Sequence, residues 1–187
     1  MLSDGRALVV YESMYGNTRE VAEAIVRGLG QCMSAKAVPV HRVEPADVAA
    51  ADLLVVGGPT HMHGMTSAMS RKGVVESGKE EGIELEESAS AEPTLRAWLA
   101  AVEGEGRRAA AFDTRIDRAP MLTGSAARGI AKRLRKRGYA LLADSNSFFV
   151  DDSEGPLAEG ELDRATRWGA GLARLTVGEP ALVATRA

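Results

Sequence analysis

Hydroxyl and glycine residues cluster between the first apolar run and the first helical pattern, in a segment that reads Ser13-Met14-Tyr15-Gly16-Asn17-Thr18. Ser13 and Thr18 supply hydroxyls, Gly16 can adopt a positive φ, and the helix that follows begins with unpaired backbone amides. Such a helix N-terminus binds a phosphate dianion through its amides and dipole, without a lysine. The spacing matches neither GxxxxGK(S/T) nor GxGxxG, so it favours one terminal phosphate over a nucleoside triphosphate or a dinucleotide pyrophosphate.

A purely structural explanation of this segment stays open at this point. Asn17 and Glu20 have the spacing of a capping box, and Gly16 could simply shape the turn. The segment directly follows Ala7–Tyr11, a short continuous apolar run that is typical of a strand buried on both faces. Ligands of open α/β sheets bind at such strand ends, so the position favours anion binding.

Two further segments follow predicted buried strands, and we expect them at the same edge of the sheet. The second reads Gly57-Gly58-Pro59-Thr60-His61-Met62-His63-Gly64, where the paired glycines would let a flat ring approach the backbone. The third reads Phe112-Asp113-Thr114-Arg115. Arg115 could stabilise a developing negative charge there, or it could be a solvated residue after an ordinary turn.

The two histidines of the second segment, His61 and His63, allow several roles. No Cys, Asp or Glu lies near them in the sequence to complete a metal site, so we expect none. They could be exposed loop residues, or they could contact a ligand. A catalytic histidine would donate a proton or a hydrogen bond to a substrate oxygen.

Apolar runs and helical patterns alternate along most of the chain. The predicted strands are Ala7–Tyr11, Lys36–Val43, Leu53–Val56, Ala109–Phe112 and Ala140–Ala143, the last extended in one reading through Phe148–Val150. Pro39 cannot donate to a sheet ladder, so it places the second strand at an edge. Amphipathic helices are predicted over Thr18–Leu29, Leu95–Val102, Ala127–Leu134 and Leu162–Leu175. This alternation indicates an α/β fold with a parallel sheet covered on both faces.

One segment interrupts the alternation. Met65–Ala91 has no apolar periodicity and is rich in glutamate. We therefore expect a single domain over residues 4–178, an irregular acidic insertion at about 65–92 and a tail over 179–187. The insertion could cover a site, dock a basic partner or be a disordered solvated segment.

Composition excludes several classes of protein. The 187 residues, 45% of them hydrophobic, suit one globular domain, and the net charge of −3 argues against nucleic acid as the main partner. Cys32 is the only cysteine, so a disulfide framework is excluded. The N-terminal sequence does not have the pattern of a signal peptide, and no apolar run approaches the roughly 18 residues of a membrane span. We expect a cytoplasmic protein that binds no membrane.

Residues 11–25, YESMYGNTREVAEAI, resemble the opening of the flavodoxin family, whose first loop wraps the phosphate of flavin mononucleotide (FMN). The version with Tyr15 is more similar to the quinone-reductase branch than to the short electron carriers. This resemblance implies a flavodoxin-like three-layer sandwich with a five-stranded parallel sheet of order 2-1-3-4-5.

The resemblance also implies FMN as the cofactor. Ser13–Thr18 would then hold the phosphate, Pro59–Gly64 would flank the isoalloxazine ring and Phe112–Arg115 would close its pyrimidine side; no catalytic residue is assigned. The implied function is electron transfer or NAD(P)H/quinone-type oxidoreduction, with a redox partner protein, NAD(P)H or a quinone as partner and an open oligomeric state. The second segment lacks the tryptophan that often stacks on the ring, so a flavodoxin-fold module that has lost its flavin, acting as a binding or regulatory protein, is the alternative.

Overall fold

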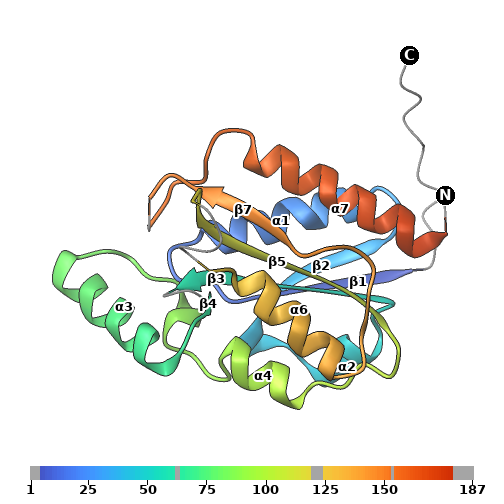
Figure 1. The fold of residues 1–187 in the computed structure, drawn as a ribbon, viewed down its shortest axis with the longest axis horizontal. Helices are drawn as coiled ribbons and strands as arrows, with labels where there is room; N and C mark the ends of the chain where they lie inside the picture. Colours follow the sequence, from blue (N-terminus) through green and yellow to red (C-terminus); the bar gives the residue numbers. More distant parts are fainter. Residues whose placement is uncertain (1–4, 62–63, 119–123, 153, 179–187) are drawn as a thin grey trace.

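A parallel sheet with helices on both faces forms the centre of the computed structural model, which describes residues 5–61, 64–118, 124–152 and 154–178 (Figure 1). The strands run in the order β2-β1-β3-β5, and both β6 and β7 pair with β5. With β6 and β7 taken together as the fifth strand, this is the predicted order 2-1-3-4-5. The strands are β1 (Arg6–Tyr11), β2 (Ser34–Pro39), β3 (Leu53–His61), β5 (Arg108–Ile116), β6 (Ala140–Leu141) and β7 (Asn146–Val150).

Strands β3 and β5 are longer than the sequence pattern predicts. This corrects the expectation that the second and third predicted segments are loops that follow their strands. Both of the predicted ligand loops begin inside strands, because the parallel ladder continues past the apolar runs. Its last pairs join Gly58 to Asp113 and Pro59 to Thr114. The edge strand β2 is also displaced: it ends at Pro39, and a short 3-10 helix, η1 (Val40–Arg42), follows. Proline has no N–H for the ladder, which accounts for the end of the strand.

Helices α1 and α7 cover one face of the sheet, and α2, α4 and α6 cover the other (Figure 1). Two glycines let α1 and α7 approach backbone to backbone. A Cβ on Gly28 would lie 2.0 Å from the Thr166 carbonyl oxygen, and one on Gly169 would lie 2.3 Å from that of Ile25. The helices are α1 (Asn17–Leu29), α2 (Pro45–Ala49), α4 (Leu95–Ala101), α6 (Ala126–Lys136) and α7 (Glu161–Val177).

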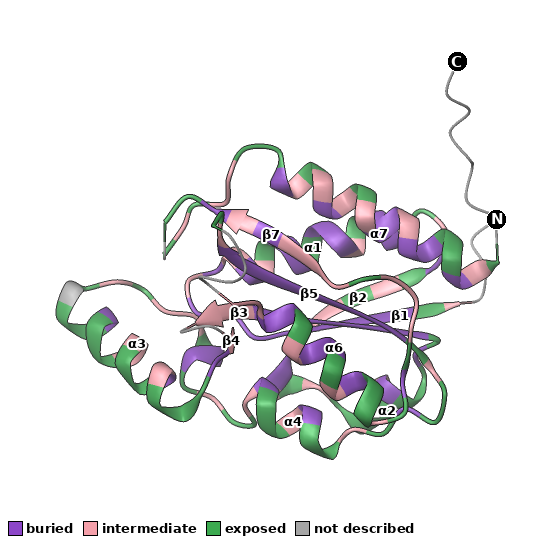
Figure 2. Ribbon diagram, viewed as in Figure 1, coloured by how far each residue is buried: buried purple, intermediate pink, exposed green. Residues whose placement is uncertain are grey.

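The segment after β3 contains regular structure, so the expectation of an irregular insertion is wrong for most of its length. A two-residue strand, β4 (Gly64–Met65), pairs antiparallel with β3, and α3 (Ala68–Glu81) and a 3-10 helix, η2 (Glu87–Ala89), follow. Helix α3 begins with a capping box and ends at Gly82 in the left-handed conformation. It projects from the body of the molecule and is mostly exposed (Figure 2), so it carries no apolar stripe for periodicity to detect.

Residues 86–91, which we call the strap, run from the end of this insertion across to the loop after β1. Most of the central strand residues are buried, whereas most of the insertion is exposed or half-buried; Ser88 and Ala89 of the strap are among its buried residues (Figure 2). As for membrane insertion, no helix within the described parts of the chain has both the length and the apolar character to cross a bilayer.

Candidate functional site

The loop between β1 and α1 adopts the conformation that its glycine allows. Gly16 has φ +94°, a left-handed conformation that costs other residues about 1–2 kcal/mol, and it is the residue immediately before α1. Its N–H donates to Ser13 Oγ over 3.1 Å, and Ser13 is fully buried. The Ser13 hydroxyl therefore shapes the loop from within.

Helix α1 begins without a side-chain cap. Gly16 has no side chain to accept from the first amides of the helix, so the N-terminal turn keeps donors that no intrahelical carbonyl can satisfy. The capping-box alternative for Asn17 is wrong: Asn17 is the first helical residue, and its side-chain amide donates to the Glu154 carbonyl over 2.8 Å. An open, positively polarised helix end thus faces the carboxyl edge of the sheet.

A pocket at this edge brings the three predicted segments together. It encloses about 90 Å³, which suits a phosphate-sized group, whereas a cofactor-sized ligand would extend beyond it. Its aromatic residues are Tyr15 and His61. The pocket wall consists of Met14, Tyr15, Asn17, Thr18, Pro59, Thr60, His61, Thr114, Arg115, Ile116 and Val150. Ile116 and Val150 are additions that sequence reasoning missed, because they lie at strand ends beyond the predicted segments.

Two threonines fasten the first loop to the third segment. The hydroxyl oxygens of Thr18 and Thr114 lie 2.8 Å apart, and both residues are buried. The two side chains join the first turn of α1 to β5 although 96 positions separate them in the chain. The Thr18 hydroxyl is therefore already engaged within the protein.

The second segment forms the end of β3 and half of a short hairpin. Pro59 and Thr60 lie in the strand, while Gly64 lies in β4 opposite His61; Met62 and His63 are outside the described residues. The Nε2 atom of His61 is buried and has no hydrogen-bond partner among the described residues. Burial lowers the pKa of the His61 imidazole, so the ring is neutral at pH 7.

The third segment departs most from expectation, because Phe112 is a core residue. Its side chain is fully buried, and its ring packs edge-on against Phe148 and Trp168, with centroids 6.1 and 6.3 Å away. Gly57 makes room for this ring, since a Cβ there would lie 2.1 Å from it. Phe112 lies outside the pocket wall, so the expectation that it contacts a cofactor is corrected. Phe112 lies within β5 and faces the core, whereas the sequence interpretation counted it with the loop after the strand.

Asp113 also organises the surroundings of the pocket. One carboxylate oxygen, Oδ2, accepts hydrogen bonds from the hydroxyls of Thr60 and Ser125 and from the amide of Ala127, over 2.7–2.9 Å. These bonds hold the end of β3 and the start of α6 against β5. Asp113 is fully buried and does not belong to the pocket wall.

Arg115 is a buried cation in the pocket wall. It donates to the Arg118 carbonyl over 2.6 Å, and its guanidinium lies 5.0 Å from the centroid of the Phe149 ring. These contacts fix the charge at the pocket. The interpretation of Arg115 as a solvated turn residue is therefore wrong.

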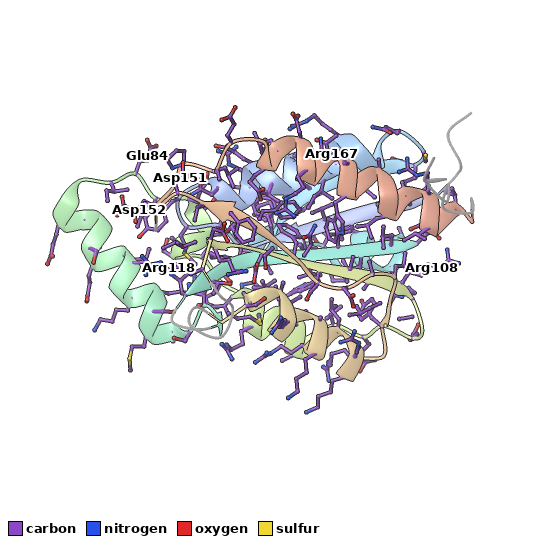
Figure 3. All side chains as sticks on the ribbon, turned by 45° about the horizontal axis from the view of Figure 1, so that its top comes forward. Glu84, Arg108, Arg118, Asp151, Asp152 and Arg167 are labelled. Carbon is purple, nitrogen blue, oxygen red and sulfur yellow. The ribbon has the colours of Figure 1, made fainter. Side chains whose placement is uncertain are left out.

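Acidic residues gather around the same end of the sheet. Figure 3 shows Glu84, Asp151 and Asp152 on the side of the molecule that also carries Arg118, away from Arg108 at the other end of β5. All three acids are exposed. Glu86, in the strap, accepts from Arg19 Nε over 2.8 Å, and its Oε1 would lie 3.4 Å from a Cβ on Gly16. A carboxylate thus stands beside the open helix end.

Comparison with known proteins adds a family model and a set of similar folds. The flavodoxin family model matches residues 9–109, and no curated protein matches the chain. A flavodoxin from the domain Archaea is 21% identical, with a TM-score of 0.63 over 92% of this chain and 99% of that one. The flavodoxin, WrbA-like protein from Agrobacterium tumefaciens is 18% identical, with a TM-score of 0.57 over 94% and 99%. Oxidised Flavodoxin 2 from Bacillus cereus is 16% identical, with a TM-score of 0.62 over 94% and 100%.

Proposed function

This chain belongs to the flavodoxin family, whose model matches more than half of its residues, and we propose that it is an FMN-dependent oxidoreductase of the NAD(P)H/quinone type. Its cofactor is FMN and its general function is redox chemistry, as in the family. The observation that carries the assignment of the site is the uncapped N-terminus of α1 in the wall of the pocket. It offers amides and a positive dipole end to one phosphate group.

Backbone groups would do most of the phosphate binding. The Ser13 and Thr18 hydroxyls are engaged with Gly16 and Thr114, while the first amides of α1 have no intrahelical acceptor. The residues at this loop therefore fit a phosphate dianion without a lysine. When bound, FMN supplies the electron-accepting and electron-donating chemistry.

The other two walls would orient the ring. Pro59 and Thr60, at the end of β3, lie beside Thr114 and Arg115 of the paired strand β5 in the pocket wall. Arg115 would supply a fixed positive charge that stabilises a reduced ring. The neutral His61 imidazole lines the pocket and would be a hydrogen-bond partner for a ring edge or a quinone oxygen.

The acidic surroundings favour a basic redox partner protein. Glu84, Asp151 and Asp152 lie at the end of the sheet that carries the pocket, where they would steer a positively charged partner toward the cofactor (Figure 3). The association rate with such a partner should fall as salt is added.

Two observations favour the alternative, a flavodoxin-fold module without flavin. Glu86 holds a carboxylate near Gly16, where it opposes the approach of a dianion, and the described pocket wall has no tryptophan. Purified protein mixed with excess FMN and then desalted discriminates the two functions. Retained visible flavin absorption, tighter binding of FMN than of riboflavin, and NADH- or NADPH-driven quinone reduction support the oxidoreductase. Protein that stays colourless and inactive overturns it and supports the flavin-free module.

A further inference from the structure

The strap holds the backbone of Ser13, the residue that opens the phosphate loop. Ser88 Oγ accepts from the Ser13 N–H over 3.0 Å and donates to the Ser13 carbonyl, and both residues are buried. The neighbouring Glu86 N–H donates to the Met14 carbonyl over 2.8 Å. Three hydrogen bonds thus tie the strap to the start of the loop, two of them between Ser13 and Ser88, which are 75 positions apart in the sequence.

One buried guanidinium holds the strap itself. Arg71, on α3, has a side chain that is only 8% exposed, and it donates to the Glu92 carboxylate over 3.0 Å. Its remaining donors satisfy carbonyls of the strap, those of Ser88, Ala89 and Ala91. Because one planar group meets several carbonyls, it fixes the course of the strap more firmly than any single bond would.

Arg71 also connects the strap to β1. Its Nε lies 3.9 Å from Glu12 Oε1, and the other oxygen of Glu12 accepts from the Leu95 amide over 3.1 Å. Glu12 is buried and directly precedes Ser13. The loop is therefore held on one side by the strand that leads into it and on the other by the strap.

All three polar groups of Ser13 are used in this arrangement. Its N–H and carbonyl bind Ser88, and its hydroxyl accepts from Gly16. A loop that must present amides to a phosphate gains affinity when its conformation is set before the ligand arrives, since less ordering entropy is lost on binding. The strap supplies that order from outside the loop.

We propose that Arg71 and Ser88 are positioning residues for the cofactor phosphate: through the strap they hold Ser13–Thr18 in its anion-binding conformation. This inference rests on the proposed FMN site, and it gives the acidic insertion a role other than covering the pocket. Neither residue contacts the cofactor in this proposal, so their effect passes through the loop alone.

Ser88→Ala tests the proposal, with Ser90→Ala as its matched control. Ser90 lies in the same strap, but it is exposed and bonds only within it. Affinities for FMN and for riboflavin, which lacks the phosphate, are measured by titrating flavin fluorescence. We expect Ser88→Ala to weaken FMN binding about tenfold and to leave riboflavin binding nearly unchanged, because a buried donor and acceptor lose their partner. Ser90→Ala should behave as the wild type.

Arg71→Lys should act in the same direction and more strongly, since an ammonium cannot reach all of the strap carbonyls that Arg71 satisfies. Equal losses of FMN and riboflavin affinity in Ser88→Ala would show general damage and overturn the proposal, as would unchanged FMN affinity. A wild type that does not distinguish FMN from riboflavin would overturn the proposed phosphate site itself. The wild-type titration therefore separates failure of the function from failure of the strap.

Discussion

The phosphate loop and the carboxyl end of β5 lie side by side in the wall of one pocket, yet they are built in different ways. Ser13–Thr18 is a contiguous loop that contributes Met14, Tyr15, Asn17 and Thr18 to the wall. Phe112–Arg115 is part of β5, and only its last two residues, Thr114 and Arg115, line the pocket, whereas Phe112 and Asp113 are buried outside it. Most residues of the loop therefore line the pocket, whereas this part of β5 divides its residues between the pocket and the buried interior.

Phe112→Ala should produce the largest effect if this division is correct. Removing a fully buried ring should lower the free energy of unfolding by about 3–5 kcal/mol, because it leaves a cavity against Phe148 and Trp168. Urea denaturation measures the change, and Leu175→Ala, at a residue 43% exposed, serves as a near-neutral control. Native-like stability combined with a loss of FMN affinity would make Phe112 a ligand residue after all.

Asp113→Ala should have the next largest effect. The substitution leaves the Thr60 and Ser125 hydroxyls and the Ala127 amide without their acceptor, which should lower the free energy of unfolding by about 2–3 kcal/mol. Asp117→Ala, at an exposed position nearby, is the control. Thermal or urea unfolding of the two variants side by side decides the matter; equal stabilities would mean that α6 is held without this carboxylate.

Gly16→Ala tests whether the phosphate loop needs its left-handed residue. A Cβ at φ +94° strains the backbone by about 1–2 kcal/mol, so FMN affinity should fall roughly tenfold as the loop relaxes. Gly73→Ala in α3 is the matched control, since its Cβ meets nothing within 4 Å and helix propensity favours alanine. If isothermal titration finds the two variants equally tight for FMN, the left-handed residue is not needed for binding.

Glu86→Gln should strengthen FMN binding. The substitution removes a negative charge beside the helix end and releases Arg19, so we expect about 0.5–1 kcal/mol, a two- to fivefold tighter complex at low salt. Riboflavin affinity should not change. Glu80→Gln, at an exposed position on α3, provides the control. Weaker FMN binding in Glu86→Gln would mean that the Arg19–Glu86 pair shapes the loop more than it repels the phosphate.

His61 should give the smallest effect, seen as a pH dependence. Burial lowers its folded pKa, so below the unfolded value of about 6.5 the unfolded chain binds a proton that the folded chain does not. The stability that the neutral imidazole contributes is therefore complete above that pH and is lost as the pH falls below it. Unfolding free energies measured between pH 7 and 5 should drop more in the wild type than in His61→Gln. Parallel plots of unfolding free energy against pH for the two proteins would show that folding does not lower the pKa of His61.

Local patterns in the sequence predicted several features well. Apolar runs such as Ala7–Tyr11 predicted buried strands, and Pro39 predicted the edge position of β2, which the structure confirms. Gly138, with φ +84°, follows the C-cap residue of α6, Arg137, as a glycine often does at the end of a helix. Each of these signals is read from one short stretch of chain, because the backbone chemistry that causes it is local.

Other features carry no local signal. Helix α3 is mostly solvent-exposed, so its cap residues and Gly82 define it rather than an apolar stripe. Ser88 and Arg71 look like ordinary surface residues in the sequence, and only the folded chain buries them against Ser13 and Glu12. The engagement of Thr18 with Thr114 is equally invisible, since 96 positions separate them.

The sequence by itself determined that a glycine-containing loop joins a buried strand to a helix, and thus that an anion site can form there. It also determined the alternation that orders the sheet. Only the tertiary structure decided which polar atoms remain available to a ligand, because it engages the Thr18 hydroxyl with Thr114, 96 positions away. Propensity and capping act within a few residues, whereas the final use of each donor depends on what the fold places beside it.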